Sequence, residues 1–268
     1  MWDFEHEPGK SRLAERYSMH QTTPAACADE LIQGTADIGL VPVATCTFAP
    51  SLAVVPGCAI ASLGDIRSIL LVVKHADGVK GVRRIALDTS SRTSAVYTRI
   101  LFHKYWNASA EFVSHAPDLD AMLGVADAAL LIGDPALLAL EDRAAREQRT
   151  GKKLIYLDLG HEWHALTRSA WVSAFWAVRP EGLREAGVSA EAVVRDFQQS
   201  RDHGLARVDD LVAEWSARLT VPEATIRTYL THNIHYYLDA ACLEGLQLFY
   251  RYGMECGALP AIPDLRFL

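Results

Sequence analysis

Apolar residues along this chain fall into short runs that alternate with longer amphipathic stretches. Residues 66–73 form a nearly continuous apolar run rich in β-branched side chains, as expected for a strand buried on both faces. The same reasoning predicts further strands at 38–43, 84–87, 111–114, 127–132, 153–157 and 171–178. After Pro180 the pattern becomes helical throughout. This order predicts an α/β protein with a mostly parallel sheet and a helical C-terminal part.

Polar residues mark where the helices begin and end. Thr23 before Pro24 predicts the start of a helix that stops at Gly34. A helix after residue 94 turns Val96, Ile100 and Leu101 inward, with Tyr105 nearby on the same face. Further helices are predicted at 119–123, 136–148, 189–203, 208–219, 222–233 and 239–256, with Ser189, Thr220 and Asp239 as caps.

The beginning of the chain fits this pattern less well. Residues 11–17 and 25–33 precede the first convincing strand, and the apolar residues 2–4 have no run in front of them. A mostly parallel sheet normally opens with a buried strand. We therefore expect that an opening strand is missing because the chain starts inside a longer reading frame; the alternative is that the fold begins here. The first residues also lack the basic start and apolar stretch of a signal peptide.

Composition narrows the range of partners and compartments. With 26 Lys and Arg against 33 Asp and Glu, the net charge of -7 argues against nucleic acid or an anionic membrane as a partner. No apolar run reaches the roughly 18–20 residues that span a bilayer. The five cysteines are widely spaced, odd in number and without a CxxC pair, which favours reduced, buried thiols in a cytoplasmic protein.

The segment 88–94, DTSSRTS, is the strongest candidate for a ligand site. Five hydroxyl side chains and Arg92 lie between a predicted strand and a predicted helix. The unpaired N–H groups and the dipole at a helix N-terminus attract an anion, and an arginine can hold a carboxylate in a bidentate fork. The alternative is a helix that is simply well capped by one Ser or Thr, although a cap needs a single hydroxyl.

Two further turns carry weaker signals. In residues 59–64, AIASLG, small side chains allow a ligand to approach the backbone, and Ser62 offers a hydroxyl; an ordinary Ser-Gly turn explains the same residues. In residues 131–136, LIGDPA, a buried strand ends at Gly133 and Asp134, where Asp134 is either an N-cap before Pro135 or part of a site. Ligands of open α/β sheets sit at such strand ends.

Motifs for metals and cofactors are weak or absent in the sequence. His161 and His164 flank Glu162 but stand three apart rather than four, so they do not form the zinc motif of metalloproteases. His232 and His235 are also three apart and are interpreted as a packed or exposed helix end. Phosphate-binding and dinucleotide-binding glycine patterns do not occur, so no cofactor is expected. We expect the aromatic residues Trp163, Trp171, Phe175 and Trp176 to pack in the core; the alternative is that one of them faces a cleft.

Several of these strings resemble one family when they are taken in order. GTADIGLVP at 34–42, AIASLG at 59–64, ALDTSSRTS at 86–94, LIGDPAL at 131–137 and GLQLFYRY at 245–252 resemble the chorismate dehydratases of the futalosine route to menaquinone. The similarity extends from about Tyr17 to the C-terminus. The family's opening Leu-Asn segment, whose Asn faces the cleft, has no counterpart in this sequence.

The resemblance implies a type II periplasmic-binding-protein-like fold, with two lobes around a cleft and a chain that crosses between them twice. Residues 66–73 would lead from lobe one into lobe two, and residues 171–178 would lead back. Residues 1–74 and 178–268 would form lobe one, lacking its first strand, and residues 75–177 would form lobe two.

The implied reaction is loss of water from chorismate, giving 3-[(1-carboxyvinyl)oxy]benzoate. The expected substrate-binding residues are Ser62, Gly64, Ser90, Ser91, Arg92, Thr93, Ser94 and Gly133, with Ser62, Ser91 and Asp134 as catalytic candidates. The base is either Asp88 or Asp134 or a carboxylate of the substrate itself. Two alternatives stay open, namely the dihydroxynaphthoate synthase of the same pathway and a solute-binding protein that captures a carboxylate.

Overall fold

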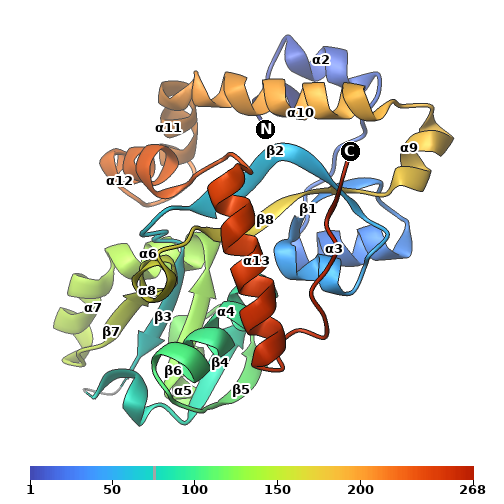
Figure 1. Ribbon diagram of the computed structural model, residues 1–268. Coiled ribbons are helices and arrows are strands. Elements are labelled where there is room, and N and C mark those ends of the chain that lie inside the picture. Colours follow the sequence, from blue (N-terminus) through green and yellow to red (C-terminus); the bar gives the residue numbers. More distant parts are fainter. Residues whose placement is uncertain (75–76) are drawn as a thin grey trace.

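A computed structural model describes residues 1–74 and 77–268, and their strands form two sheets (Figure 1). The first sheet has the order β1-β8-β2-β9, made of β1 (Ile38–Pro42), β8 (Trp171–Val178), β2 (Ala53–Ser62) and β9 (Arg266–Phe267). The second has the order β5-β4-β6-β3-β7, made of β5 (Glu111–His115), β4 (Arg84–Asp88), β6 (Ala128–Ile132), β3 (Ile69–Val73) and β7 (Ile155–Asp158).

Strand directions are mixed in both sheets, so the expectation of a mostly parallel sheet is wrong. Strand β8 runs antiparallel to both β1 and β2, and β3 runs antiparallel to both β6 and β7. The parallel pairs are β4 with β5, β4 with β6, and β2 with β9. Strand direction depends on where the chain returns in space, which the hydrophobic pattern of a single segment does not encode.

The long strand β2 is the largest strand that the hydrophobic pattern did not predict; the two-residue strand β9 and the helices at 159–167 and 180–186 were not predicted either. Pro56 and Gly57 interrupt its apolar residues, and Gly57 has a positive φ of 76°. The register with β8 shifts between Val54 and Ala59, so Pro56 and Gly57 occupy a bulge in the strand. The predicted turn at 59–64 therefore begins later, because residues 59–62 still belong to β2.

The predicted helices are present, although two of them are divided. The first sheet carries α1 (Trp2–Glu5), α2 (Gly9–Ala14), α3 (Pro24–Gln33), α9 (Pro180–Ala186), α10 (Ala190–Leu205) and α11 (Val208–Ser216); the second carries α4 (Thr93–Ile100), α5 (Leu119–Val125), α6 (Gly133–Glu141), α7 (Arg143–Thr150) and α8 (Leu159–Thr167). Helix α12 (Glu223–Thr228) continues into a π-helical turn, η4 (Tyr229–Asn233), and α13 (Ala240–Glu255) runs along β8 (Figure 1). The predicted helix 136–148 breaks at Asp142.

Four predicted caps can be checked directly. The side chains of Thr23, Ser189 and Asp239 accept hydrogen bonds from backbone N–H groups in the first turns of α3, α10 and α13, which confirms Ser189 and Asp239 as caps. Thr220 is not a cap, because α12 begins after Pro222 and has no side-chain cap. Caps that lie directly before an amphipathic run were thus predictable from sequence, because the motif is local.

A continuous core joins the two sheets, and aromatic side chains lie at its centre. Tyr97 of α4 stacks on Trp171 of β8 with ring centroids 3.6 Å apart, and its edge meets Trp163 of α8 at 4.8 Å. Burial of Trp163, Trp171 and Phe175 confirms them as core residues, whereas Trp176 is only partly buried. The five cysteines are all unpaired, three of them buried and two half-buried.

The chain leaves the first sheet after β2 and returns to it with β8, so β3 pairs in the second sheet and β8 pairs in the first. The division into two lobes stays a prediction, and its boundary at residue 75 lies outside the described residues. Among residues 1–74 and 77–268, no helix is both long and apolar enough to cross a membrane.

Candidate functional site

One edge of the second sheet gathers the three predicted turns. Strands β4 and β6 are parallel neighbours, so both end at this edge. Strand β3 runs the opposite way, with Ile69 opposite Ile132, and therefore begins there. Neighbouring strands lie about 4.8 Å apart, so the segments after Asp88, after Ile132 and before Ile69 are close in space.

The turn after β4 is built around the buried carboxylate of Asp88. Its Oδ1 accepts hydrogen bonds from the Ser90 N–H at 2.9 Å and from the Ser90 hydroxyl at 2.6 Å. Its Oδ2 is buried and has no hydrogen-bond partner in the described part of the chain. The Ser91 N–H donates to the Asp88 carbonyl oxygen at 3.1 Å, which leaves the half-buried Ser91 side chain outside this network.

Helix α4 begins in this turn without any side-chain cap. The Thr93 hydroxyl instead accepts a hydrogen bond from the Ala44 N–H at 3.3 Å, which links the start of α4 to the segment after β1. The alternative interpretation, in which a Ser or Thr of this turn serves as the N-cap, is therefore wrong. An uncapped start leaves N–H groups and the positive end of the helix dipole available to an anion.

Arg92 already has a carboxylate partner. Its Nη2 donates to Oδ1 of Asp29 in α3 at 2.7 Å, and both side chains are partly exposed. A carboxylate ligand at this helix start would share the guanidinium with Asp29. Ser94, by contrast, is buried beneath the first turn of α4.

The hydrogen bonds of the Ser62 hydroxyl stay inside its own turn. The hydroxyl is placed to donate to the carbonyl oxygens of Gly64 and Asp65, each at 3.1 Å, and it accepts from the Gly64 N–H at 3.2 Å. Since a hydroxyl has a single proton, it donates to one of these carbonyls at a time. In this arrangement Ser62 fixes the shape of the turn between β2 and β3.

Asp158 fastens this turn to the second sheet. Its carboxylate caps α8 by accepting from the N–H groups of Gly160 and His161, and it also accepts from those of Ile66 and Arg67, the latter at 2.6 Å. Burial raises the pKa of Asp158, while the hydrogen bonds from the N–H groups of Arg67, His161 and Ile66 act in the opposite direction. One carboxylate thus ties the Ser62 segment to the start of α8.

The turn after β6 brings Gly133 against the start of β3. Gly133 has a φ of 63°, and its N–H donates to the Ser68 carbonyl oxygen at 2.8 Å. Helix α6 already begins at Gly133, so Asp134 is not its N-cap, and the capping position belongs to Ile132. Asp134 is exposed in the first helical turn, where its charge raises the pKa of Tyr229 further, in addition to the larger effect of burial.

Two side chains of the π-helical turn η4 were not predicted to belong to this region. The Tyr229 hydroxyl donates to the Ser68 hydroxyl at 3.1 Å, and the Asn233 amide donates to the Asp65 carbonyl oxygen at 3.0 Å. Oδ1 of Asn233 is buried without a partner among the described residues. The sequence pattern predicted these positions only as part of the helix at 222–233, because the widening of a helix into a π turn follows from packing.

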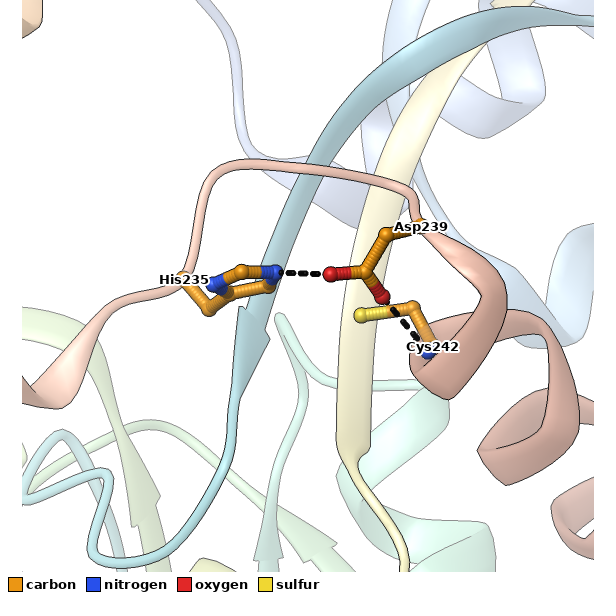
Figure 2. A group of neighbouring side chains, drawn as sticks. All are labelled: His235, Asp239 and Cys242. Carbon is orange, nitrogen blue, oxygen red and sulfur yellow. Dashed lines mark hydrogen bonds and ion pairs between the residues drawn. The ribbon is translucent and has the colours of Figure 1, made fainter.

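A second cluster lies where the loop after η4 meets α13. Nε2 of His235 and Oδ2 of Asp239 are 2.8 Å apart, and the other carboxylate oxygen accepts from the Cys242 N–H at 2.9 Å (Figure 2). Burial, together with the Asp239 charge, raises the pKa of the Cys242 thiol to about 12. The sequence predicted His235 at a helix end, and this prediction is wrong: His235 lies in an extended segment that is bridged to Ala61. These three residues form a candidate metal-binding group.

A cavity of about 180 Å³ lies between the first sheet and the helices α1, α10 and α11. Its walls are mainly apolar and aromatic, and the residues that the sheet and the η4 region contribute are Leu40, Cys58, Ala59, Ile60, Trp176, Leu230 and Tyr236. Trp176 is thus the predicted core aromatic that faces an opening. None of the predicted site residues lines this cavity.

The family model described as menaquinone biosynthesis matches residues 2–255. The chain belongs to this family. The match covers every strand except β9 and every predicted turn, so the resemblance seen in the sequence strings is confirmed at the level of the family.

Solved structures with the same fold extend to other kinds of protein. A protein of Archaeoglobus fulgidus is 14% identical with a TM-score of 0.70, covering 96% of this chain and 93% of its own. The periplasmic aliphatic sulphonate binding protein of Escherichia coli is 18% identical with a TM-score of 0.57, covering 91% and 82%. A Candida albicans protein with the generic periplasmic binding protein fold is 12% identical with a TM-score of 0.58, covering 89% and 78%. This member of the menaquinone biosynthesis family therefore has a periplasmic-binding-protein-like fold.

Proposed function

We propose that this chain is a carbon-oxygen lyase, a chorismate dehydratase, that removes water from chorismate and yields 3-[(1-carboxyvinyl)oxy]benzoate. The observation that carries the proposal is the uncapped start of α4 beside Ser90, Ser91 and Arg92, at the sheet edge that also holds Gly133. A dianion with two separated carboxylates needs such a donor-rich helix start. Membership of the menaquinone biosynthesis family supports a role in that pathway. Unpaired cysteines support a cytoplasmic location.

In this proposal the helix start and Ser91 hold one carboxylate, with Arg92 as the charge partner that it shares with Asp29. Ser62 and Gly64 contact the second carboxylate or the departing hydroxyl, for which the Ser62 hydroxyl exchanges a bond inside its turn. Holding both carboxylates apart disfavours the competing pericyclic rearrangement, and such positioning supplies several kcal/mol of the barrier.

The reaction is an elimination of water from two adjacent ring carbons. The C–H bond at the ether-bearing ring carbon supplies the electron pair of the new ring double bond, and the C–OH bond at the adjacent ring carbon breaks. The proton and the hydroxide together form water, and the ring becomes aromatic. We assign the proton to a carboxylate of the substrate, with Asp88 and Asp134 as the protein groups that the experiment must exclude.

The test is incubation of the purified chain with chorismate, followed by ultraviolet absorbance and mass spectrometry. The expected product is lighter than chorismate by one water. Ser91→Ala should lower kcat/KM by about 10²-fold, the cost of one transition-state donor. Ser114→Ala, an exposed serine at the end of the neighbouring strand β5, is the matched control and should have no effect.

Two outcomes would overturn the proposal or its details. Unchanged chorismate that only raises Tm favours the alternative of a solute-binding protein, an activity supported by the fold shared with the sulphonate-binding protein. A loss above about 10⁴-fold in kcat for Asp88→Asn or Asp134→Asn, with binding intact, would identify a protein base instead.

A further inference from the structure

His235, Asp239 and Cys242 bring three different donor atoms together, and none of the three is among the residues proposed to bind chorismate. An imidazole nitrogen, a carboxylate oxygen and a thiol sulfur all lie within 4.8 Å of one another. Figure 2 shows the three side chains pointing toward one another across the short loop before α13. The His235 side chain is 23% exposed and that of Asp239 43%, whereas Cys242 is fully buried. The group is thus partly accessible to solvent, through His235 and Asp239.

Backbone contacts hold these residues in place. His235 exchanges two hydrogen bonds with Ala61 of β2, at 2.9 and 2.8 Å. Asp239 is the N-cap of α13, and Cys242 stands three residues later, so its side chain returns toward the cap. Because β2 fixes one donor and the helix start fixes two, little ordering is needed for all three to meet one ion.

Capping explains only part of this arrangement. The cap uses the Asp239 oxygen that accepts from the Cys242 N–H, whereas the second oxygen faces His235. The Cys242 thiol is hydrogen-bonded to the same carboxylate, which a cap does not require. We propose that His235, Asp239 and Cys242 bind a zinc ion, with water in the fourth position. Sulfur and imidazole donors favour zinc over magnesium or calcium, which prefer oxygen ligands.

Charge favours the same ion. A thiolate and a carboxylate carry two negative charges, and imidazole carries none, so a divalent ion makes the group neutral. A neutral group is the least costly arrangement beside the buried sulfur of Cys242. Binding releases the thiol proton, so the affinity should rise with pH.

Such an ion would tie the loop after η4 to α13 and, through the backbone of His235, to β2. Ala61 directly precedes Ser62, so the ion would stiffen the end of the strand from which the Ser62 turn starts. The proposal does not depend on the reaction assigned to this chain, because it predicts metal binding and not activity.

The test uses Co²⁺ as a spectroscopic probe on the metal-free, reduced full chain, followed by displacement with Zn²⁺. A thiolate on cobalt gives a sulfur-to-metal charge-transfer band in the near ultraviolet, and the expected stoichiometry is one ion per chain. Cys242→Ser should abolish the band, and His235→Ala should weaken binding at least tenfold. Asp239→Asn keeps a good N-cap and should also weaken binding at least tenfold.

The matched controls are His232→Ala and Cys256→Ser, which remove a nearby imidazole and the half-buried thiol just after α13. Both should bind cobalt as the unaltered chain does. Circular dichroism verifies that each variant is folded. The absence of a charge-transfer band in the unaltered chain, its survival in Cys242→Ser, or its loss in Cys256→Ser would each overturn the proposal. Undiminished binding by Asp239→Asn would remove the carboxylate from the ligand set and overturn the three-ligand site.

Discussion

Replacing Gly160 with alanine should disturb the Ser62 turn without replacing any of the predicted ligand-binding residues. A Cβ added at Gly160 would lie 2.7 Å from the carbonyl oxygen of Gly64 and 3.1 Å from Cβ of Ile66. The first neighbour is backbone, so no side-chain rotation relieves the clash. Either α8 or the turn must move by about half an ångström to restore van der Waals contact.

The magnitude follows from the cost of overpacking, which is typically 1–3 kcal/mol. We expect a loss of about 2 kcal/mol, which for a chain of this length is a fall in Tm of about 4–8 °C. The displaced Gly64 carbonyl is one of the two acceptors available to the Ser62 hydroxyl, so chorismate turnover should fall as well.

Gly124→Ala is the matched control, because a Cβ at Gly124 in α5 meets no atom within 4 Å. Alanine there should leave stability unchanged or raise it by up to about 1 kcal/mol, through its higher helix propensity. Urea denaturation and thermal melts of both variants, with chorismate assays, supply the comparison. Equal melting temperatures for the two variants would refute the close packing of α8 on the Ser62 turn.

Three further predictions concern the core, a buried thiol and the charge at α4. Tyr97→Phe removes the hydroxyl that accepts a hydrogen bond from the Val172 N–H at 3.2 Å, and it should lower the free energy of unfolding by about 1–2 kcal/mol in urea denaturation. The control Tyr105→Phe, at an exposed position, should leave the free energy of unfolding unchanged. Equal losses in the two variants would contradict the Tyr97–Val172 hydrogen bond. Burial raises the pKa of the Cys46 thiol to about 12, so iodoacetamide at pH 8 should label the half-buried Cys256 before Cys46. Peptide mass spectrometry measures the order of labelling, and the reverse order would contradict this prediction. Asp29→Asn frees Arg92 from its exposed ion pair and should lower KM for chorismate by up to about fivefold; a raised KM would count against Arg92 as a substrate ligand.

Local signals in the sequence were sufficient for most of the strands. Residues 69–73 are buried on both faces, as the uninterrupted apolar run predicts, and the predicted strand at 171–178 matches β8 at both ends. These segments carry their own evidence, because a strand covered on both sides has no polar face. The predicted caps Ser189 and Asp239 were correct for the same reason, since the cap and the N–H group that it accepts from lie within one turn.

What the sequence did not reveal depends on contacts between distant segments. In the sequence alone, Gly57 resembles a residue that ends a strand, because the pairing with β8 that continues beyond the bulge is not encoded locally. Strand β2 was therefore not predicted. Neither antiparallel pairing of β3 nor the π turn at 229–233 has a local signature. Each of these features is fixed by a partner more than fifty residues away.

The candidate site shows the same limit at the level of single side chains. Residue types alone placed Ser62, Ser90 and Arg92 in polar turns, and the sheet topology brings those turns to one edge. The direction of each side chain was not predictable, because it is decided by a partner: a carbonyl of its own turn for Ser62, Asp88 for Ser90, and Asp29 for Arg92.

These partners divide the predicted residues into two physical groups. Ser62 and Ser90 have hydroxyls already bonded to neighbouring backbone or carboxylate oxygens, so replacing them first changes the shape of a turn. Ser91 and the uncapped N–H groups of α4 stand outside that network and can donate to a ligand without breaking an existing bond. In the proposed reaction, a variant of the first group should therefore lose stability together with activity. A variant of the second group should lose activity alone, and this separation distinguishes a turn that shapes the site from a donor that contacts the substrate.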